Sequence, residues 1–137
     1  MSENISEWLE NTEGTPKLVE PARVTWEAGP INPTTGASHT YRFSGMNLSN
    51  NPEAPEGIEN EITIYFQNGV VSEVGLNGIT AEHLLEILIH RFKQFQEGPF
   101  ACDENEVALT HMYAAVNAIQ KRIADRKARG VHSTYEK

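Results

Sequence analysis

The stretch that decides the fold is residues 80–130, TAEHLLEILIHRFKQFQEGPFACDENEVALTHMYAAVNAIQKRIADRKARG. In its first part, apolar side chains recur three or four positions apart, at Leu84, Leu88, Phe92 and Phe95. The second part has the same spacing, at Leu109, Met112, Val116, Ile119 and Ile123. This spacing lines one face of an α-helix with apolar side chains. The dipeptide Gly98-Pro99 between the two parts cannot continue a helix, because proline lacks the amide hydrogen. We therefore predict two amphipathic helices packed antiparallel as a hairpin.

Three segments that precede the hairpin alternate apolar and polar residues, as half-buried β-strands do. They are residues 22–28, 39–45 and 61–66. The last is followed by Asn68-Gly69, the dipeptide best suited to a two-residue hairpin turn, since both positions accept positive φ. A returning strand is therefore predicted through Val70, Val71 and Val74. The predicted fold class is α+β, with about four antiparallel strands followed by an antiparallel two-helix hairpin.

The chain has 137 residues, a length that fits one domain. Residues 1–20 are predicted to form a polar N-terminal arm. Two readings of this arm stay open: it is mobile, or Ile5, Trp8 and Leu9 make one helical turn that docks on the body. Residues 21–137 are predicted to form a single α+β domain. It is divided into strands over 22–76, the helical hairpin over 80–130 and a short tail over 131–137.

The ends of both helices carry recognisable signals. Thr80 is well placed to cap the first helix, and Asp103 with Glu106 three residues later is the pattern of a capping box at the start of the second. Lys127 and Arg129 suit the negative end of the helix dipole, and Gly130 is predicted to stop the helix.

Composition narrows the class of protein. The net charge of −8 argues against general DNA or RNA binding, which depends on neutralising phosphates. No apolar run approaches the roughly 18 residues that a membrane span needs, and the acidic start lacks the features of a secretory signal. A single cysteine, Cys102, forms no internal disulfide and no CxxC motif, which fits a reducing, intracellular setting. We expect no membrane or nucleic-acid partner.

Catalytic and metal-binding patterns are absent from the sequence. His83 and His90 share a face of the first helix, but two helical turns separate them by about 10 Å, too far to chelate one ion together. No HExxH motif, nucleophile elbow or Walker loop occurs. The prediction is therefore a non-enzyme without metal or cofactor, whose histidines are solvated residues of the helix surface.

Charge is distributed unevenly, and this points to an anion site. Residues 1–90 hold 13 acidic and 3 basic side chains, whereas residues 91–137 hold 6 acidic and 8 basic ones. Arg122, Arg126 and Arg129 are spaced four and three apart, so they stack on one face of the second helix. Arginine donates two parallel hydrogen bonds to phosphate oxygens. The alternative without a ligand is that these arginines are solvated and interact favourably with the negative end of the helix dipole.

Groups that suit a nucleobase also occur in the hairpin. Phe95 and Phe100, at and just beyond the end of the first helix, have rings that can stack on a base. Asn105, in the first turn of the second helix, has an amide that can read a base edge. Together with the arginines they compose a candidate nucleotide pocket, although phenylalanines such as these two are more often part of the core.

The motifs FQxGPFAC, ENxxAL and RxxDRxARGV, here RIADRKARGV, resemble the helical-hairpin proteins of bacteriophages, over about residues 61–137. That superfamily includes the anti-Thoeris and anti-CBASS sponges. The resemblance implies a non-enzymatic protein that holds a host immune messenger, either a cyclic ADP-ribose isomer or a cyclic oligonucleotide. The strands before the hairpin are more similar to the anti-Thoeris type. By motif position, base contacts fall on Phe95 and Asn105, and phosphate contacts on Arg122 and Arg126.

The expected protein is thus a phage-encoded sponge in the host cytoplasm that sequesters its ligand without cleaving it. A hairpin that contributes one pair of arginines needs a second subunit to close the site, so we expect a homo-oligomer. The competing hypothesis is a protein-interaction module, in which a face of the hairpin docks a partner protein.

Overall fold

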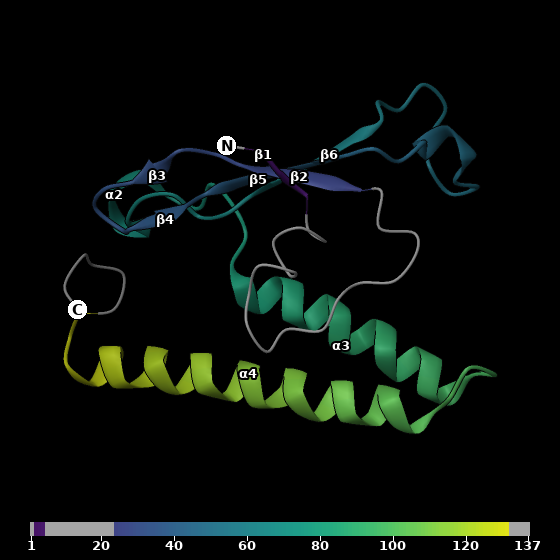
Figure 1. The fold of residues 1–137 in the computed structure, drawn as a ribbon. Helices are drawn as coiled ribbons and strands as arrows, with labels where there is room; N and C mark the ends of the chain where they lie inside the picture. The colour runs from purple at the N-terminus through teal and green to yellow at the C-terminus, as the bar shows by residue number, and fades with distance from the viewer. Residues whose placement is uncertain (1, 5–23, 132–137) are drawn as a thin grey trace. The chain divides into compact units, whose positions relative to one another are not determined.

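A computed structural model of the protein describes residues 2–4 and 24–131 (Figure 1). The chain divides into two compact units, residues 1–66 and residues 67–137, and each is described separately. The first unit is a β-sheet and the second contains the helices, so the predicted α+β class is confirmed. The predicted helical turn at Ile5, Trp8 and Leu9 lies outside the described residues, as does the tail from residue 132.

The first unit is built on a four-stranded antiparallel sheet in the order β1-β2-β5-β6. The strands are β1 (Ser2–Asn4), β2 (Thr25–Ala28), β5 (Thr40–Ser44) and β6 (Glu61–Tyr65). Between β2 and β5 in the sequence, the chain forms a separate two-stranded ribbon of β3 (Ile31–Asn32) and β4 (Ala37–Ser38), and a short helix, η1 (Leu48–Asn50), precedes β6. The three strands predicted before Asn68 all form.

The two faces of this sheet differ in chemistry. Trp26 of β2 and Tyr41 of β5 have ring centroids 5.8 Å apart, and Tyr41 meets Phe66 edge-on at 5.7 Å. On the opposite face, Arg42 of β5 forms an ion pair with Glu27, its cross-strand neighbour on β2. The alternation therefore produces one aromatic face and one polar face, as the sequence pattern predicts.

The returning strand predicted after Asn68-Gly69 is wrong. Gly69 does adopt positive φ (102°), but the chain then forms one helical turn, α2 (Val71–Val74). Side-chain amides explain the difference. Asn77 Oδ1 accepts from the N–H of Asn68 (2.8 Å), Asn77 Nδ2 donates to the Asn68 carbonyl (2.7 Å), and Gln67 Nε2 donates to the Gly75 carbonyl (2.8 Å). These bonds close the loop on itself and satisfy backbone groups that a strand partner would otherwise have to satisfy.

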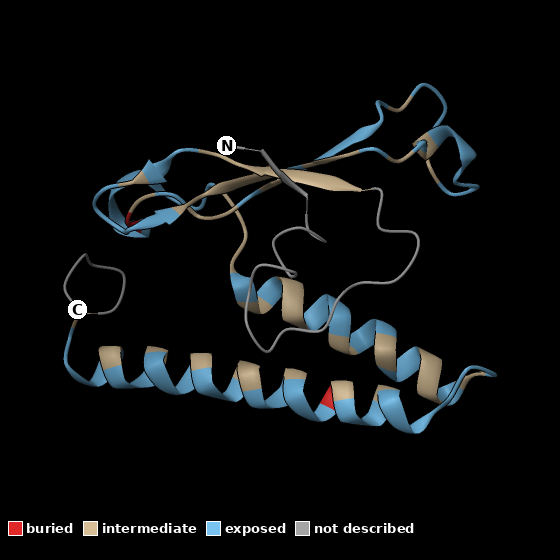
Figure 2. Ribbon diagram, in the orientation of Figure 1, coloured by how far each residue is buried: buried red, intermediate tan, exposed pale blue. Residues whose placement is uncertain are grey.

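The second unit contains the predicted hairpin. Helix α3 (Ala81–Glu97) has 17 residues and helix α4 (Asp103–Ala128) has 26, and they run antiparallel (Figure 1). Among all the described residues, only Val70 and Leu109 are buried, and both lie in this unit. The apolar stripes of the two helices are mostly intermediate in exposure (Figure 2). The two helices therefore pack against each other along a seam that buries few side chains completely, and Leu109 (6% exposed) is the buried residue of this seam.

The helix ends agree only partly with prediction. Thr80 is the N-cap of α3, and its backbone N–H donates to Nδ1 of His83 (3.0 Å), which completes a capping box. The capping box predicted from Asp103 and Glu106 is wrong, because Asp103 is already helical and the N-cap is Cys102. Glu106 instead accepts a hydrogen bond from Gln96 of α3 (3.0 Å).

Gly130 ends α4 as predicted. Its φ of 73° is the left-handed conformation that glycine adopts without steric cost. The N–H of Gly130 donates to the Lys127 carbonyl (3.0 Å), and the N–H of Val131 donates to the Arg126 carbonyl (3.0 Å). These two bonds form a Schellman motif, so the last turn is closed by its own backbone.

Candidate functional site

The C-terminal part of α4 extends beyond the helix that it packs against. The two helices are joined by a short link, so their ends at the link are nearly level, while α4 is longer by nine residues. At 1.5 Å per residue, α4 projects about 13 Å past the start of α3. We call the projecting segment, Lys121–Arg129, the basic end of α4. It holds five basic residues and one acidic residue.

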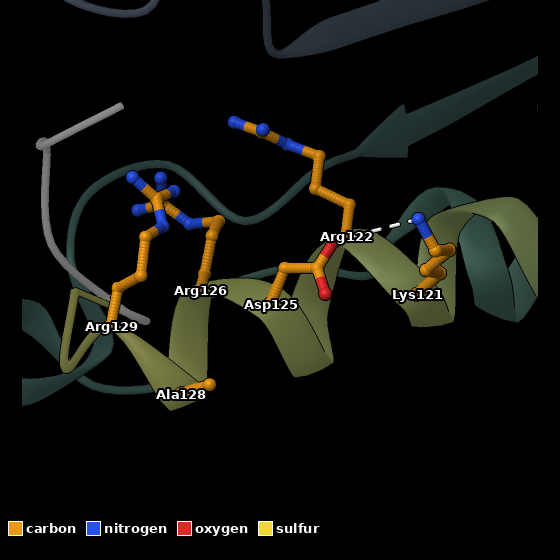
Figure 3. Close-up of a pocket in the computed structure, with 6 residues that line it drawn as sticks. All are labelled: Lys121, Arg122, Asp125, Arg126, Ala128 and Arg129. Carbon is orange, nitrogen blue, oxygen red and sulfur yellow. Dashed lines mark ion pairs between the residues drawn. The ribbon is translucent and has the colours of Figure 1, made fainter.

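The predicted arginines lie together on this basic end. Arg122, Arg126 and Arg129 project from the same side of α4, as Figure 3 shows. They border an open surface hollow of about 710 Å³ whose lining residues are Lys121, Arg122, Asp125, Arg126, Ala128 and Arg129. An anion in this hollow would meet several guanidinium donors at once, which is the arrangement that charge-assisted binding of phosphate requires.

The side chains of the basic end differ in how firmly they are held. Arg126 is half-buried, and its Nη2 donates to the Val131 carbonyl over 2.8 Å. Lys121 and Asp125 form an exposed ion pair one helical turn apart, with 3.9 Å between Nζ and Oδ2. Such an exposed pair contributes little to stability. Arg126 is therefore a pre-positioned donor, while Lys121 and the exposed Arg122 remain adjustable.

The predicted base-binding residues lie at the other end of the hairpin. Phe95 packs edge-on against Phe92 with centroids 5.7 Å apart, and the guanidinium of Arg91 lies 5.0 Å from the Phe95 ring centre. Phe100 is 75% exposed in the link, and Asn105 Nδ2 donates to the Phe100 carbonyl over 3.4 Å. This end thus offers an exposed ring, a partly covered ring and an amide.

Two further residues of α3, Gln96 and Arg91, contribute to this end of the hairpin and were not predicted from the sequence. The side chain of Gln96 accepts a hydrogen bond from the N–H of Cys102 and donates one to the Cys102 carbonyl, each over 3.0 Å. These two bonds fix the path of the chain between α3 and α4. Arg91 places a cation on Phe95. Gln96 lies within the FQxGPFAC motif, but the motif does not indicate its role. Arg91 lies four residues before Phe95, a helical spacing that could have indicated the contact.

Within one protomer, the structure separates the predicted site residues into two groups. Asn105 and Arg122 are 17 residues apart on the same helix, which corresponds to about 25 Å along its axis. Arg126 and Arg129 are farther still. A single mononucleotide-sized ligand therefore cannot touch Asn105 and Arg122 of the same chain.

The described residues contain neither a cluster of metal-ligand side chains nor a membrane-spanning helix. Over residues 2–4 and 24–131, no three His, Cys, Asp or Glu side chains gather as a metal site would require. In the same described ranges, no helix combines the length and apolar character needed to cross a membrane.

Comparison with known protein families identifies the hairpin. Residues 57–124 match the Acb2/Tad1 hairpin domain. The helical hairpin of this chain belongs to that family. The family expectation drawn from FQxGPFAC and RIADRKARGV is thereby confirmed.

The chain is also similar to a named phage protein. It is 43% identical over 75 residues to Thoeris anti-defense 1 of Bacillus phage SBSphiJ7. The alignment covers 55% of this chain and 53% of that protein, so the chain spans about half the length of the curated relative that it matches. The family match, residues 57–124, includes Phe95, Phe100, Asn105 and Arg122, and it ends before Arg126 and Arg129.

Proposed function

We propose that this protein is a phage anti-defence sponge that binds a host immune nucleotide messenger and keeps it from its effector. The ligand class is a cyclic ADP-ribose isomer or a cyclic oligonucleotide. The observation that carries the proposal is the basic end of α4, a helix whose first part lies within the residues that match the Acb2/Tad1 hairpin domain. The name of the phage relative, Thoeris anti-defense 1, supports the anti-defence role. The protein acts in the host cytoplasm, where such messengers are made.

Sequestration requires binding of the ligand but no reaction, and arginine side chains bind phosphate groups well. A phosphate that leaves water must recover its lost hydration through several donors. The hollow at the basic end of α4 is bordered by three arginines and one lysine, with Asp125 as its one acidic lining residue. Guanidinium groups stay protonated near neutral pH, so they supply charge without acting as a general acid or base. The ligand is therefore released intact.

We further propose that two copies of the chain share each site. The base-binding group at Phe95 and Asn105 lies about 25 Å from Arg122 of the same chain, by helical rise. A second hairpin that runs in the opposite direction brings its own basic end to the Phe95 end of the first. One ligand can then have its base held by one copy and its phosphates by the other, in a homo-oligomer.

A protein-interaction module remains the second candidate, because the hairpin exposes large apolar side chains. Ile87 is 63% exposed on α3 and Val107 is 56% exposed on α4. Exposed apolar residues on one compact unit are a common mark of protein contacts. Under this hypothesis a partner protein covers the hairpin, and loss of an arginine is tolerated.

Incubation with a ligand panel decides between the two. The purified chain is mixed with cyclic dinucleotides, cyclic trinucleotides and cyclic ADP-ribose isomers, desalted and then heated. Recovery of one intact nucleotide from the denatured protein supports the sponge, and recovery of an altered nucleotide shows an enzyme. If no panel member is retained, the sponge proposal fails and the interaction module is favoured.

Calorimetry of Arg122→Ala tests the arginine clamp itself. Loss of a charged hydrogen bond of about 1.5–3 kcal/mol predicts affinity about tenfold to a hundredfold lower. Lys127→Ala is the matched control, because it removes the same charge from α4 at a position outside the hollow. Equal affinities for the parent and Arg122→Ala would remove the clamp.

A further inference from the structure

Strand β6 lies at an edge of the four-stranded sheet. It pairs with β5 on one side, and no other described strand lies on its outer side. The N–H of Phe66, next in the chain, donates to the carbonyl of His39 beside β5. Backbone groups of an antiparallel strand alternate between its two sides. Those of Ile62 and Ile64 therefore point to β5, and those of Glu61, Thr63 and Tyr65 point outward.

The sequence of β6 lacks the features that commonly protect an edge strand. Edge strands are commonly blunted by lysine, by proline or by a bulge. The sequence EITIY has none of these, and its register with β5 runs without interruption from Glu61 to Tyr65. Three of its residues are β-branched and one is aromatic, which favours pairing. Ile62 is 46% exposed and Tyr65 is 60% exposed, so the edge also leaves apolar area uncovered.

We propose that β6 pairs with β6 of a second copy of this chain, antiparallel and centred on Thr63. Thr63 then faces Thr63 of the second copy, and Glu61 faces Tyr65 of the second copy. The outward N–H and C=O groups of Glu61, Thr63 and Tyr65 exchange six hydrogen bonds across the joint. The two four-stranded sheets become one continuous sheet of two protomers. This inference depends on the sheet alone, and not on the proposed nucleotide binding.

Self-complementarity favours a second copy as the occupant. In the centred register, the one charged residue of β6, Glu61, meets the ring and hydroxyl of a tyrosine, and Thr63 meets a threonine that can share a hydrogen bond with it. On the aromatic face, Ile62 meets Ile64 of the second copy. A shift of two residues leaves an outward residue of each strand unpaired. A shift of four sets two Glu61 carboxylates opposite each other, which is destabilising.

Disulfide trapping tests this register directly. The full chain carries Cys102→Ser, so that the introduced cysteine is its only thiol. With Thr63→Cys, the paired Cα atoms lie about 5.5 Å apart, within the range that a disulfide bridges. With the control Glu61→Cys, on the same strand and the same face, the two cysteines lie about 14 Å apart along the strand. Oxidised glutathione is added, and the products are separated on a non-reducing gel.

A covalent dimer from Thr63→Cys and none from Glu61→Cys is the expected result. Dimer from both variants, or from neither, overturns the proposal. If circular dichroism shows that Thr63→Cys misfolds, a mixture of Ile62→Cys and Ile64→Cys chains replaces it, since these positions face each other. The dimer must also form with Arg122→Ala added. Trapping therefore survives even if nucleotide sequestration fails.

Discussion

Nη2 of Arg126 donates a hydrogen bond of 2.8 Å to the carbonyl oxygen of Val131, five residues later in the chain. The same arginine accepts, through its own carbonyl, the N–H of Val131. Arg126 thus holds the segment after α4 from two sides. An arginine predicted as a phosphate donor thus also has a structural task.

Arg126→Ala should therefore loosen the C-terminal end of α4. The carbonyl of Val131 loses a charged donor, and the Schellman turn loses the side chain that fixes its exit. We expect faster hydrogen exchange at the amides of Gly130 and Val131, with little change in the first half of α4. Arg122→Ala is the control, as it removes an arginine one turn earlier. Equal exchange in both variants would contradict the assignment.

Leu109→Ala is expected to be the most damaging truncation in the hairpin. Leu109 is 6% exposed and sits in the seam between α3 and α4. Removing a buried leucine side chain costs about 2–5 kcal/mol of unfolding free energy, and the thin seam places the loss at the lower end. Val107→Ala, at a residue 56% exposed on the same helix, should cost no more than about 0.5 kcal/mol. Urea denaturation of the two variants measures the difference, and similar costs would show that the seam does not hold the hairpin.

His83→Ala should destabilise the start of α3. Nδ1 of His83 accepts the N–H of Thr80 (3.0 Å) and lies 3.1 Å from its hydroxyl. Loss of a helix cap costs about 1 kcal/mol. His83→Glu restores the common capping-box pair and should unfold at the same urea concentration as the parent or a higher one. A parent-like midpoint for His83→Ala would mean that the cap contributes nothing.

Local pattern predicted the elements whose partners are close in sequence. Apolar spacing located both helices, because each amphipathic face needs only the other, a few residues away. The turn at Asn68-Gly69 was misread because positive φ at Gly69 allows more than one continuation. What selects α2 is the amide of Asn77, nine residues later, bonded to Asn68. Strand β1 was not predicted, because its sequence, SEN, does not alternate apolar and polar residues. It forms by pairing with β2, which is distant in the sequence.

In the candidate site, too, the features set by helical spacing were predictable from the sequence, and those set by the fold of the link were not. The spacing of Arg122, Arg126 and Arg129 fixes their common side of α4, and the structure places them on one hollow. Their distance from Asn105 also follows from helical rise, so the sequence already implied that one chain cannot bring both groups to one ligand. The role of Gln96 depends on how the link folds, and no periodic pattern encodes that.

Gln96 offers the sharpest test of the link. Its side chain accepts the N–H of Cys102 and donates to the carbonyl of Cys102 and to Oε1 of Glu106, each over 3.0 Å. Gln96→Ala leaves these partners to water at an exposed position, so we expect a loss of about 1–2 kcal/mol in unfolding free energy. Gln94→Ala, at an exposed residue of the same helix, is the control and should be nearly neutral.

The link should also become mobile in Gln96→Ala, which NMR relaxation of the Phe100 and Cys102 amides would detect. Since Phe100 and Asn105 are tied to this link, Gln96→Ala should weaken nucleotide retention although Gln96 need not touch the ligand. Unchanged relaxation together with weakened retention would instead indicate that Gln96 contacts the nucleotide itself.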